Sequence, residues 1–137
     1  RAGGVYLPLN TAYTLNELDY FITDAEPTVI VCDPSRADGI KTIAAKVSAR
    51  VETLDANGKG SLTDAAAKAK PDFVTVPRDN DDLAAILYTS GTTGRSKGAM
   101  LSHDNLASNS HSLVDCWRFT DKDVLIHALP IYHTRGP

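Results

Sequence analysis

The run Thr28-Val29-Ile30-Val31-Cys32 decides the class of fold that this chain can adopt. β-branched residues dominate it and no charge interrupts it, which is typical of a strand buried on both faces of a parallel sheet. Apolar residues at helical spacing precede this run over residues 15–25 and follow it over residues 40–47. Strands that alternate with helices predict an α/β fold, in which partly parallel sheets carry flanking helices.

The same alternation extends along the rest of the chain. Further strands are predicted at residues 4–9, 51–54, 83–88, 99–101 and 124–129. Each consists mainly of apolar residues, and turn-forming residues bound most of them.

Side chains able to cap a helix precede each helical pattern. In residues 14–17 a hydroxyl and a carboxylate three positions apart form a capping box. The pattern repeats from Ser35, and Ser102 suits the start of a helix that reaches about Trp117. An Ala-rich, capped helix is predicted over residues 61–70. The side chains of the last helix that should face inward are Leu106, Leu113 and Trp117.

Residues 71–82 are the best candidate for a linker. They contain Pro71 and Pro77, which interrupt regular structure, and three aspartates that favour exposure to water. We therefore predict an exposed connection between two sub-lobes.

Composition excludes several classes of protein. The 137 residues carry 14 Lys and Arg against 17 Asp and Glu, a formal net charge of −3, whereas nucleic-acid or anionic-membrane binders have a basic excess. With 42% hydrophobic and 23% charged residues, disordered and fibrous classes are excluded, and no apolar run is long enough to span a bilayer. Cys32 and Cys116 match no metal-ligand spacing and are interpreted as small core residues of a reduced protein.

The two ends of the sequence predict a piece of a longer protein. The chain opens on Arg1 rather than Met, and it stops at Pro137 directly after an apolar stretch. A cytoplasmic location is expected from the lack of a signal or membrane segment, although a targeting peptide would precede Arg1.

The segment that carries chemistry is Tyr88-Thr89-Ser90-Gly91-Thr92-Thr93-Gly94-Arg95-Ser96-Lys97-Gly98. Its glycines let the backbone approach a ligand closely, so that successive N–H groups can point at one anion. Its hydroxyls can donate hydrogen bonds to phosphate oxygens, and Lys97 supplies a mobile positive charge. The loop is therefore predicted to bind a polyphosphate, although it is neither a P-loop nor a GxGxxG turn. A flexible hydroxyl-rich turn between two strands is the alternative.

The order of residues in this loop resembles the phosphate-loop motif of the adenylate-forming superfamily of acyl-CoA synthetases, nonribosomal-peptide adenylation domains and luciferases. Only Ser96 departs from that motif, at a position where most members have proline. Residues 3–10 and 128–136 resemble an earlier and a later block of the same family. The three blocks occur in the family's order and cover nearly the whole chain.

The resemblance implies that residues 1–137 are an internal fragment of the large, AMP-binding N-terminal domain of an adenylate-forming enzyme. In this family a carboxylate and ATP give an acyl-adenylate and pyrophosphate, after which the thiol of CoA displaces AMP. Residues 94–103 look most like bacterial malonyl-CoA synthetases, so the expected acid is malonate, although Arg135 stands where that subgroup has His. ATP, Mg²⁺ and CoA would serve the parent ligase, whereas the fragment alone is expected to be inactive.

The resemblance also implies roles for individual residues. Lys97 and His133 are the two candidate catalytic residues. His133 would lie on the acyl side of the adenylate site and help to place the carboxylate, and Tyr132 would line the same pocket. The residues expected to clasp the β- and γ-phosphates of ATP are Thr89, Ser90, Gly91, Thr92, Thr93, Gly94 and Lys97.

No metal site is predicted within the chain. His103 and His111 are interpreted as surface residues and His127 as a core residue, because none has a partner at metal-ligand spacing. The aspartates in residues 79–82 are interpreted as a solvated linker rather than a Mg²⁺ site, since the family's metal carboxylate lies beyond Pro137.

Two other functions stay open at this point. One is a non-catalytic nucleotide- or phosphate-binding module, against which the intact Lys97 and its neighbouring hydroxyls argue. The other is a different acid–thiol ligase, specific for a medium-chain or aromatic acid. The expected partners are a small carboxylic acid, ATP, CoA and the remainder of the parent chain, with no nucleic acid and no membrane.

Overall fold

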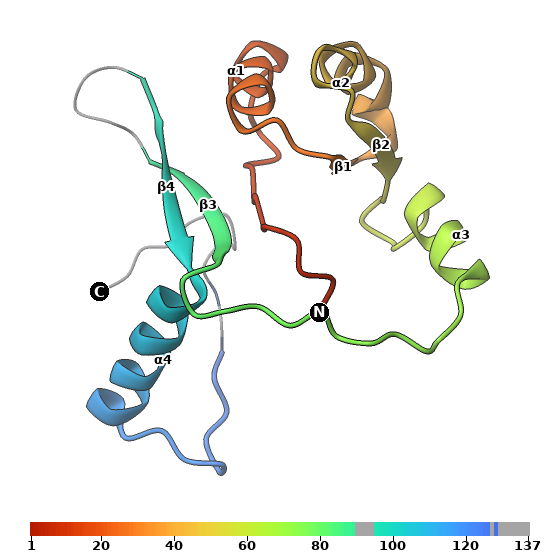
Figure 1. Cartoon of the computed structure of the whole chain (residues 1–137). Coiled ribbons are helices and arrows are strands. Elements are labelled where there is room, and N and C mark those ends of the chain that lie inside the picture. The colour runs from red at the N-terminus through yellow and green to blue at the C-terminus, as the bar shows by residue number, and fades with distance from the viewer. Residues whose placement is uncertain (90–94, 127, 129–137) are drawn as a thin grey trace. The chain divides into compact units, whose positions relative to one another are not determined.

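The chain folds into two compact units (Figure 1), one formed by Thr11–Phe73 and one by Arg1–Asn10 together with Val74–Pro137. The computed structural model describes residues 1–89, 95–126 and 128. Within them, one strand pair is parallel and the other is antiparallel, which confirms the predicted α/β class with partly parallel sheets. None of the helices in these ranges is long and apolar enough to cross a membrane.

The Thr11–Phe73 unit contains a parallel strand–helix–strand arrangement. Strands β1 and β2 pair in parallel, with Val29 opposite Arg50 and Cys32 opposite Thr53. A connection through helices is what parallel pairing requires, since a short turn cannot return the chain to the same end of the sheet. In chain order the elements are α1 (Leu15–Ala25), β1 (Val29–Cys32), η1 (Pro34–Arg36), α2 (Ala37–Ala44), η2 (Ala45–Val47), β2 (Arg50–Thr53) and α3 (Ser61–Lys68).

The core of this unit lies between helices α1 and α2. Ile22 of α1 is fully buried, and the ring of Phe21 packs 4.9 Å from the ring of Tyr13, measured between centroids. Strand β1 is not buried on both faces as predicted, because Val29 and Val31 remain 51% and 47% exposed. The other core side chains are Leu18, Ala37, Ile40, Ile43 and Ala44.

The helix starts of this unit confirm one predicted cap and correct two. At α1 the capping box is present, since Glu17 N donates to Thr14 Oγ1 over 3.3 Å and Thr14 N donates to the Glu17 carboxylate over 2.8 Å. The cap predicted at Ser35 is wrong, because Ser35 lies inside η1 and its N–H donates to Asp33 Oδ1 over 2.9 Å. Helix α3 begins after Gly60 without a side-chain cap.

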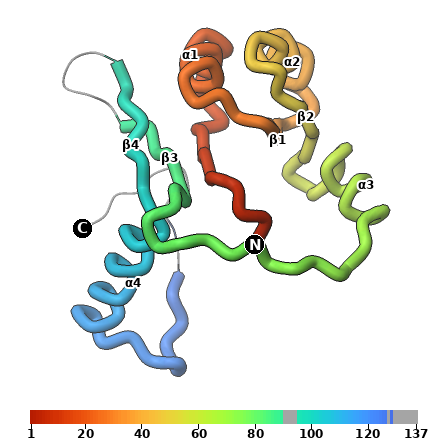
Figure 2. The backbone as a smooth tube through the Cα atoms, viewed as in Figure 1, coloured from red at the N-terminus to blue at the C-terminus, as the bar shows by residue number. Residues whose placement is uncertain are grey.

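The second unit is built on a β-hairpin and the helix that follows it. Strands β3 (Leu83–Thr89) and β4 (Lys97–Ser102) pair antiparallel, and α4 (His103–Trp117) continues directly from β4. Only Tyr6 of the predicted strand 4–9 pairs, with Tyr6 N donating to Ala84 O over 2.9 Å and Ile86 N donating to Tyr6 O over 3.0 Å. The chain path in Figure 2 shows the N-terminal segment in red and β3 in green, although both belong to this unit.

Several predicted buried positions of this unit are exposed. Trp117 is 54% exposed and Leu106 is also exposed, so only the half-buried Leu113 of the three predicted inward-facing residues is substantially covered. Residues 124–126 form no strand, and Val124 is 90% exposed. Cys116 is exposed and Cys32 half-buried, so neither thiol is a core residue. An amphipathic pattern indicates which face can be buried, but burial also needs a partner, and α4 packs mainly against β4 in the described chain.

Candidate phosphate-binding hairpin

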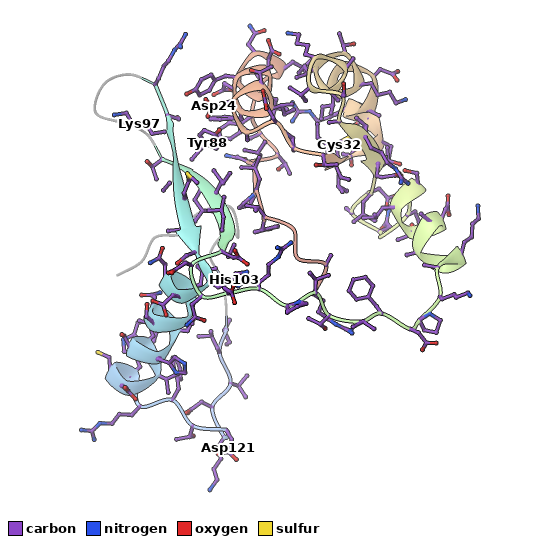
Figure 3. The ribbon with its side chains drawn as sticks, viewed as in Figure 1. Asp24, Cys32, Tyr88, Lys97, His103 and Asp121 are labelled. Carbon is purple, nitrogen blue, oxygen red and sulfur yellow. The ribbon has the colours of Figure 1, made fainter. Side chains whose placement is uncertain are left out.

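The β3–β4 hairpin holds the two ends of the Gly- and hydroxyl-rich loop next to each other. The Cα atoms of Tyr88 and Gly98 face each other across the strands, as do those of Thr89 and Lys97. Figure 3 labels Tyr88 and Lys97 at the same end of the hairpin, next to the loop. Antiparallel pairing follows from the short connection between the strands. The hydroxyl that opens the loop and the ammonium that closes it are therefore carried by neighbouring backbone positions.

Two of the predicted site residues lie in the described part of the chain, and both are exposed. Thr89 ends β3 and Lys97 begins β4. Both side chains are therefore accessible to a ligand in solution. The predicted site residues that lie outside the described residues are Ser90, Gly91, Thr92, Thr93, Gly94, Tyr132 and His133.

The base of the loop is closely packed at Gly98. A Cβ atom placed on Gly98 would lie 3.0 Å from Ile86 Cγ2 and 3.4 Å from both Cε1 and Cζ of Tyr88. The sequence identifies Tyr88 and Gly98 only as parts of the loop motif and indicates no packing between them. The signal available in the sequence was an aromatic residue and a glycine at the two ends of one hairpin loop.

The start of α4 is not a second anion site. Helix N-termini bind phosphates through free N–H groups, but here three such groups in the first turn already donate within the protein. His103 N donates to Asp82 O over 3.0 Å, and Asp104 N donates to Asn80 O over 2.9 Å. Asn105 N donates to Ser102 Oγ over 3.2 Å, which confirms Ser102 as the predicted cap. The loop, rather than the start of α4, is therefore the candidate for phosphate binding.

The imidazole rings have surface positions where the structure describes them. His103 and His111 are both exposed, as predicted, whereas His127 lies outside the described residues. The described residues contain no group of three His, Cys, Asp or Glu side chains that could hold a metal ion.

The acidic turn before β3 has a structural role in this hairpin. Asp79 N donates to Asp82 Oδ2 over 3.0 Å, and Asp82 N donates to Asp79 O over 3.1 Å, so these residues form a closed turn. Arg78 lies 3.9 Å from the Asp82 carboxylate and donates from Nε to Gly3 O over 3.0 Å. The turn thereby connects β3 to the N-terminal segment of the same unit.

Comparisons with known proteins extend over nearly the whole chain. The chain matches the AMP-binding enzyme family over residues 1–136. A crystal structure of ATP-bound MatB from Rhodopseudomonas palustris is 78% identical, with a TM-score of 0.92 over 98% of this chain and 27% of that one. The malonate–CoA ligase of Arabidopsis thaliana is 32% identical over 137 residues, which are 98% of this chain and 22% of the relative. A feruloyl-CoA synthase from Amycolatopsis is 38% identical over 134 residues, 97% of this chain and 25% of the relative.

This chain spans about a quarter of the length of the relatives that it matches. The family match nevertheless extends over almost all of it and includes both units. The chain therefore belongs to the family of AMP-binding enzymes.

Proposed function

We propose that this chain is the phosphate-binding part of an ATP-dependent, AMP-forming ligase that joins malonate to CoA. The observation that carries the proposal is the β3–β4 hairpin, which brings Thr89 and Lys97 together at the ends of a loop rich in glycine and hydroxyls. The 78% identity to a MatB crystallised with ATP supports ATP as the nucleotide.

The hairpin suits the charge change that adenylation requires. The malonate carboxylate attacks the α-phosphorus of ATP, the bond to the bridging oxygen breaks, and pyrophosphate leaves with the electron pair. The Lys97 ammonium and the hydroxyls of Thr89, Ser90, Thr92 and Thr93 would bind the β- and γ-phosphates and stabilise the departing pyrophosphate. The backbone N–H groups of Gly91 and Gly94 would bind the same oxygens.

The second half-reaction needs groups beyond those on the hairpin. The CoA thiol attacks the acyl carbon of the malonyl-adenylate, and AMP leaves to give malonyl-CoA. His133 would lie at the acyl side of the adenylate, and Tyr132 would line the same pocket. We propose a cytoplasmic location for this reaction.

Mg²⁺ would enter bound to ATP rather than at a site on the described residues. Near the hairpin, the Asp82 carboxylate already accepts a hydrogen bond from Asp79 N, and the described residues contain no group of three metal ligands. A Mg²⁺ ion on ATP would neutralise part of the phosphate charge. Lys97 would supply the positive charge that the protein itself contributes at the loop.

A ligase for an aromatic acid is the second candidate. The 38% identity to a feruloyl-CoA synthase supports it, whereas the malonate–CoA ligase of Arabidopsis thaliana is 32% identical. We prefer malonate because the amino-acid sequence of residues 94–103 resembles that of malonyl-CoA synthetases. A non-catalytic nucleotide-binding module has no such observation in its favour.

The decisive test uses a chimeric protein in which this chain replaces the matching segment of Rhodopseudomonas palustris MatB. This chimera is called the exchange enzyme below, after the exchanged segment. The 78% identity and the TM-score of 0.92 make this replacement feasible. Pyrophosphate exchange into ATP would be measured with malonate, methylmalonate, acetate, longer acids and ferulate. We expect malonate to give the highest rate, within about tenfold of the unmodified host, which is about 1.4 kcal/mol of activation free energy.

The host protein and the isolated 137-residue chain serve as controls. The isolated chain should give no malonate-dependent exchange, because it spans only 27% of the MatB chain. A folded exchange enzyme that binds ATP but activates ferulate better than malonate would support the aromatic alternative. A folded exchange enzyme that neither binds ATP nor catalyses exchange would overturn the proposal.

A further inference from the structure

The aromatic ring of Tyr88 and the bare backbone of Gly98 form a cross-strand pair at the base of the phosphate loop. Their Cα atoms are partners in the antiparallel register, so both residues belong to the same face of the hairpin. The Cε1 and Cζ atoms of the ring lie 3.4 Å from the place where a Cβ of Gly98 would be. The ring therefore packs against the space that glycine leaves open.

Glycine is needed at position 98 for space rather than for an unusual backbone angle. The described glycines with positive φ are Gly3, Gly58 and Gly60, so Gly98 has a backbone conformation open to other residues. The limit is set by Ile86, whose Cγ2 atom would lie 3.0 Å from an added Cβ, together with the Tyr88 ring. A side chain at position 98 would push the ring or Ile86 away from the strand.

This packing lies one residue from both ends of the loop. Thr89 follows Tyr88, Lys97 precedes Gly98, and Thr89 and Lys97 are themselves opposite each other. An aromatic ring that covers a glycine across a strand pair fixes the register of the two strands. At this position the fixed register determines which residue of β3 lies opposite Lys97, and in this structure that residue is Thr89.

We infer that Tyr88 and Gly98 are positioning residues for the triphosphate of ATP. The ring–glycine pair holds the two ends of the loop in register and thereby places Lys97 at the β- and γ-phosphates. This inference rests on the proposed function, because it concerns how the same loop grips ATP. It predicts that disturbing the pair weakens the use of ATP selectively and leaves the use of the acid unchanged.

The test compares four variants of the exchange enzyme. Tyr88→Leu removes the ring, Tyr88→Phe retains it, and Gly98→Ala inserts a methyl group that would press on Ile86 and contact the ring. The matched control is Met100→Ala, because Met100 lies opposite Ile86 on the same face of the hairpin but further from the loop. The KM values for ATP and malonate, kcat and the melting temperature would be measured for each.

Tyr88→Leu should raise the KM for ATP about tenfold, because a displacement of about 1 Å at a charged contact can cost up to a hundredfold in rate. The KM for malonate should not change. Tyr88→Phe keeps the ring and should have the KM for ATP of the unmodified exchange enzyme. Gly98→Ala should raise the KM for ATP, as Tyr88→Leu does. Met100→Ala should leave the KM for ATP unchanged.

Three results would overturn the inference while leaving the proposed function intact. One is a folded Tyr88→Leu variant with an unchanged KM for ATP. Another is a rise in the KM for ATP in Met100→Ala that equals the rise in Tyr88→Leu. The third is a parallel rise in the KM for malonate in Tyr88→Leu. If Tyr88→Leu fails to fold, Gly98→Ala makes the same test, and an unchanged KM for ATP in that variant counts against the pair. An unmodified exchange enzyme that does not bind ATP would instead overturn the proposed function, and this inference with it.

Discussion

Lys97 is an exposed residue at the start of β4, where the loop proposed to bind phosphate ends. Its effect on catalysis can therefore be separated from its effect on the stability of the fold. Lys97→Ala in the exchange enzyme should lower pyrophosphate exchange by about a hundredfold or more, as loss of one electrostatic contact to a developing charge does elsewhere. The free energy of unfolding should change by less than about 0.5 kcal/mol, because the side chain is on the surface. Exchange rates and urea denaturation would measure the two effects.

The control for this substitution is Lys122→Ala, which removes another exposed lysine that the loop motif does not include. It should change neither the exchange rate nor the stability. Unchanged exchange in Lys97→Ala would remove Lys97 from the proposed site.

The two cysteines should differ in their reactivity toward alkylating reagents. Burial raises the pKa of the Cys32 thiol, and the negative charge of the adjacent Asp33 raises it further, so less of the reactive thiolate is present at neutral pH. Cys116 is exposed on α4. Iodoacetamide at pH 7.5 should therefore modify Cys116 first, as measured by mass spectrometry of the Cys32→Ser and Cys116→Ser variants. Faster modification of Cys32 would contradict its half-buried position.

At the scale of the element, helix α1 depends on a cap that the sequence identifies locally. Thr14→Ala removes the acceptor for Glu17 N and should cost about 1 kcal/mol of unfolding free energy. Thr14→Ser keeps a hydroxyl and should recover most of that loss. Thermal unfolding followed by circular dichroism would compare the two, and equal melting temperatures would show that the cap contributes nothing.

Helix α3 has no side-chain cap, and a buried carboxylate on the neighbouring strand holds its first residue instead. Ser61 Oγ donates to the Glu52 carboxylate, which the Arg50 guanidinium also contacts, while Ser61 N donates to Thr53 Oγ1 over 3.0 Å. The hydrogen bond from Ser61 lowers the pKa of Glu52 below its usual value, with a further contribution from Arg50. Ionised Glu52 therefore stabilises the start of α3.

This arrangement predicts a pH-dependent stability. Because the pKa of Glu52 is lower in the folded chain, its contribution is complete above the pKa of an unfolded glutamate, about 4.3. It is lost as the pH falls through the lower folded value. The urea midpoint should drop between pH 7 and pH 3 by more in the natural chain than in Glu52→Gln. Identical pH profiles for the two proteins would contradict this role of Glu52.

Helix starts could be predicted from the sequence because residues close together in the chain determine them. The burial of side chains could not, because it depends on residues far away in the chain. The capping boxes at Thr14 and Ser102 involve residues three positions apart, so the sequence alone located both helix starts. The exposure of Trp117 and Val31 could not be read from their apolar character, because a side chain becomes buried only where another surface covers it. At the site, the motif identified Lys97, whereas the packing of Tyr88 on Gly98 needed the strand register.

At the scale of the whole molecule, the boundary between the two units should be visible to proteases. Lys68 ends α3 and is exposed, whereas Arg78 is held by its contacts with Gly3 and Asp82. Trypsin should therefore cut after Lys68 faster than after Arg78 in the folded chain, as measured by mass spectrometry at early times.

The matched variant is Arg78→Lys, which keeps a trypsin site but loses the guanidinium that donates to Gly3 O. Cleavage at position 78 should accelerate in this variant. Equal early cleavage after Lys68 and Arg78 in the natural chain would argue against the predicted linker organisation.

The pairing of Tyr6 with β3 has a consequence for the order in which a newly made chain can fold. Gly3 and Arg78, which hold this unit together, are 75 positions apart, and the entire Thr11–Phe73 unit is synthesised between them. Because domains fold as they emerge from the ribosome, that unit can finish folding while residues 1–10 still lack their partners on β3. The β3–β4 hairpin, a local structure that closes within about ten microseconds, then captures them. Residues 1–10 are thus translated before the Thr11–Phe73 unit but reach their native contacts after it.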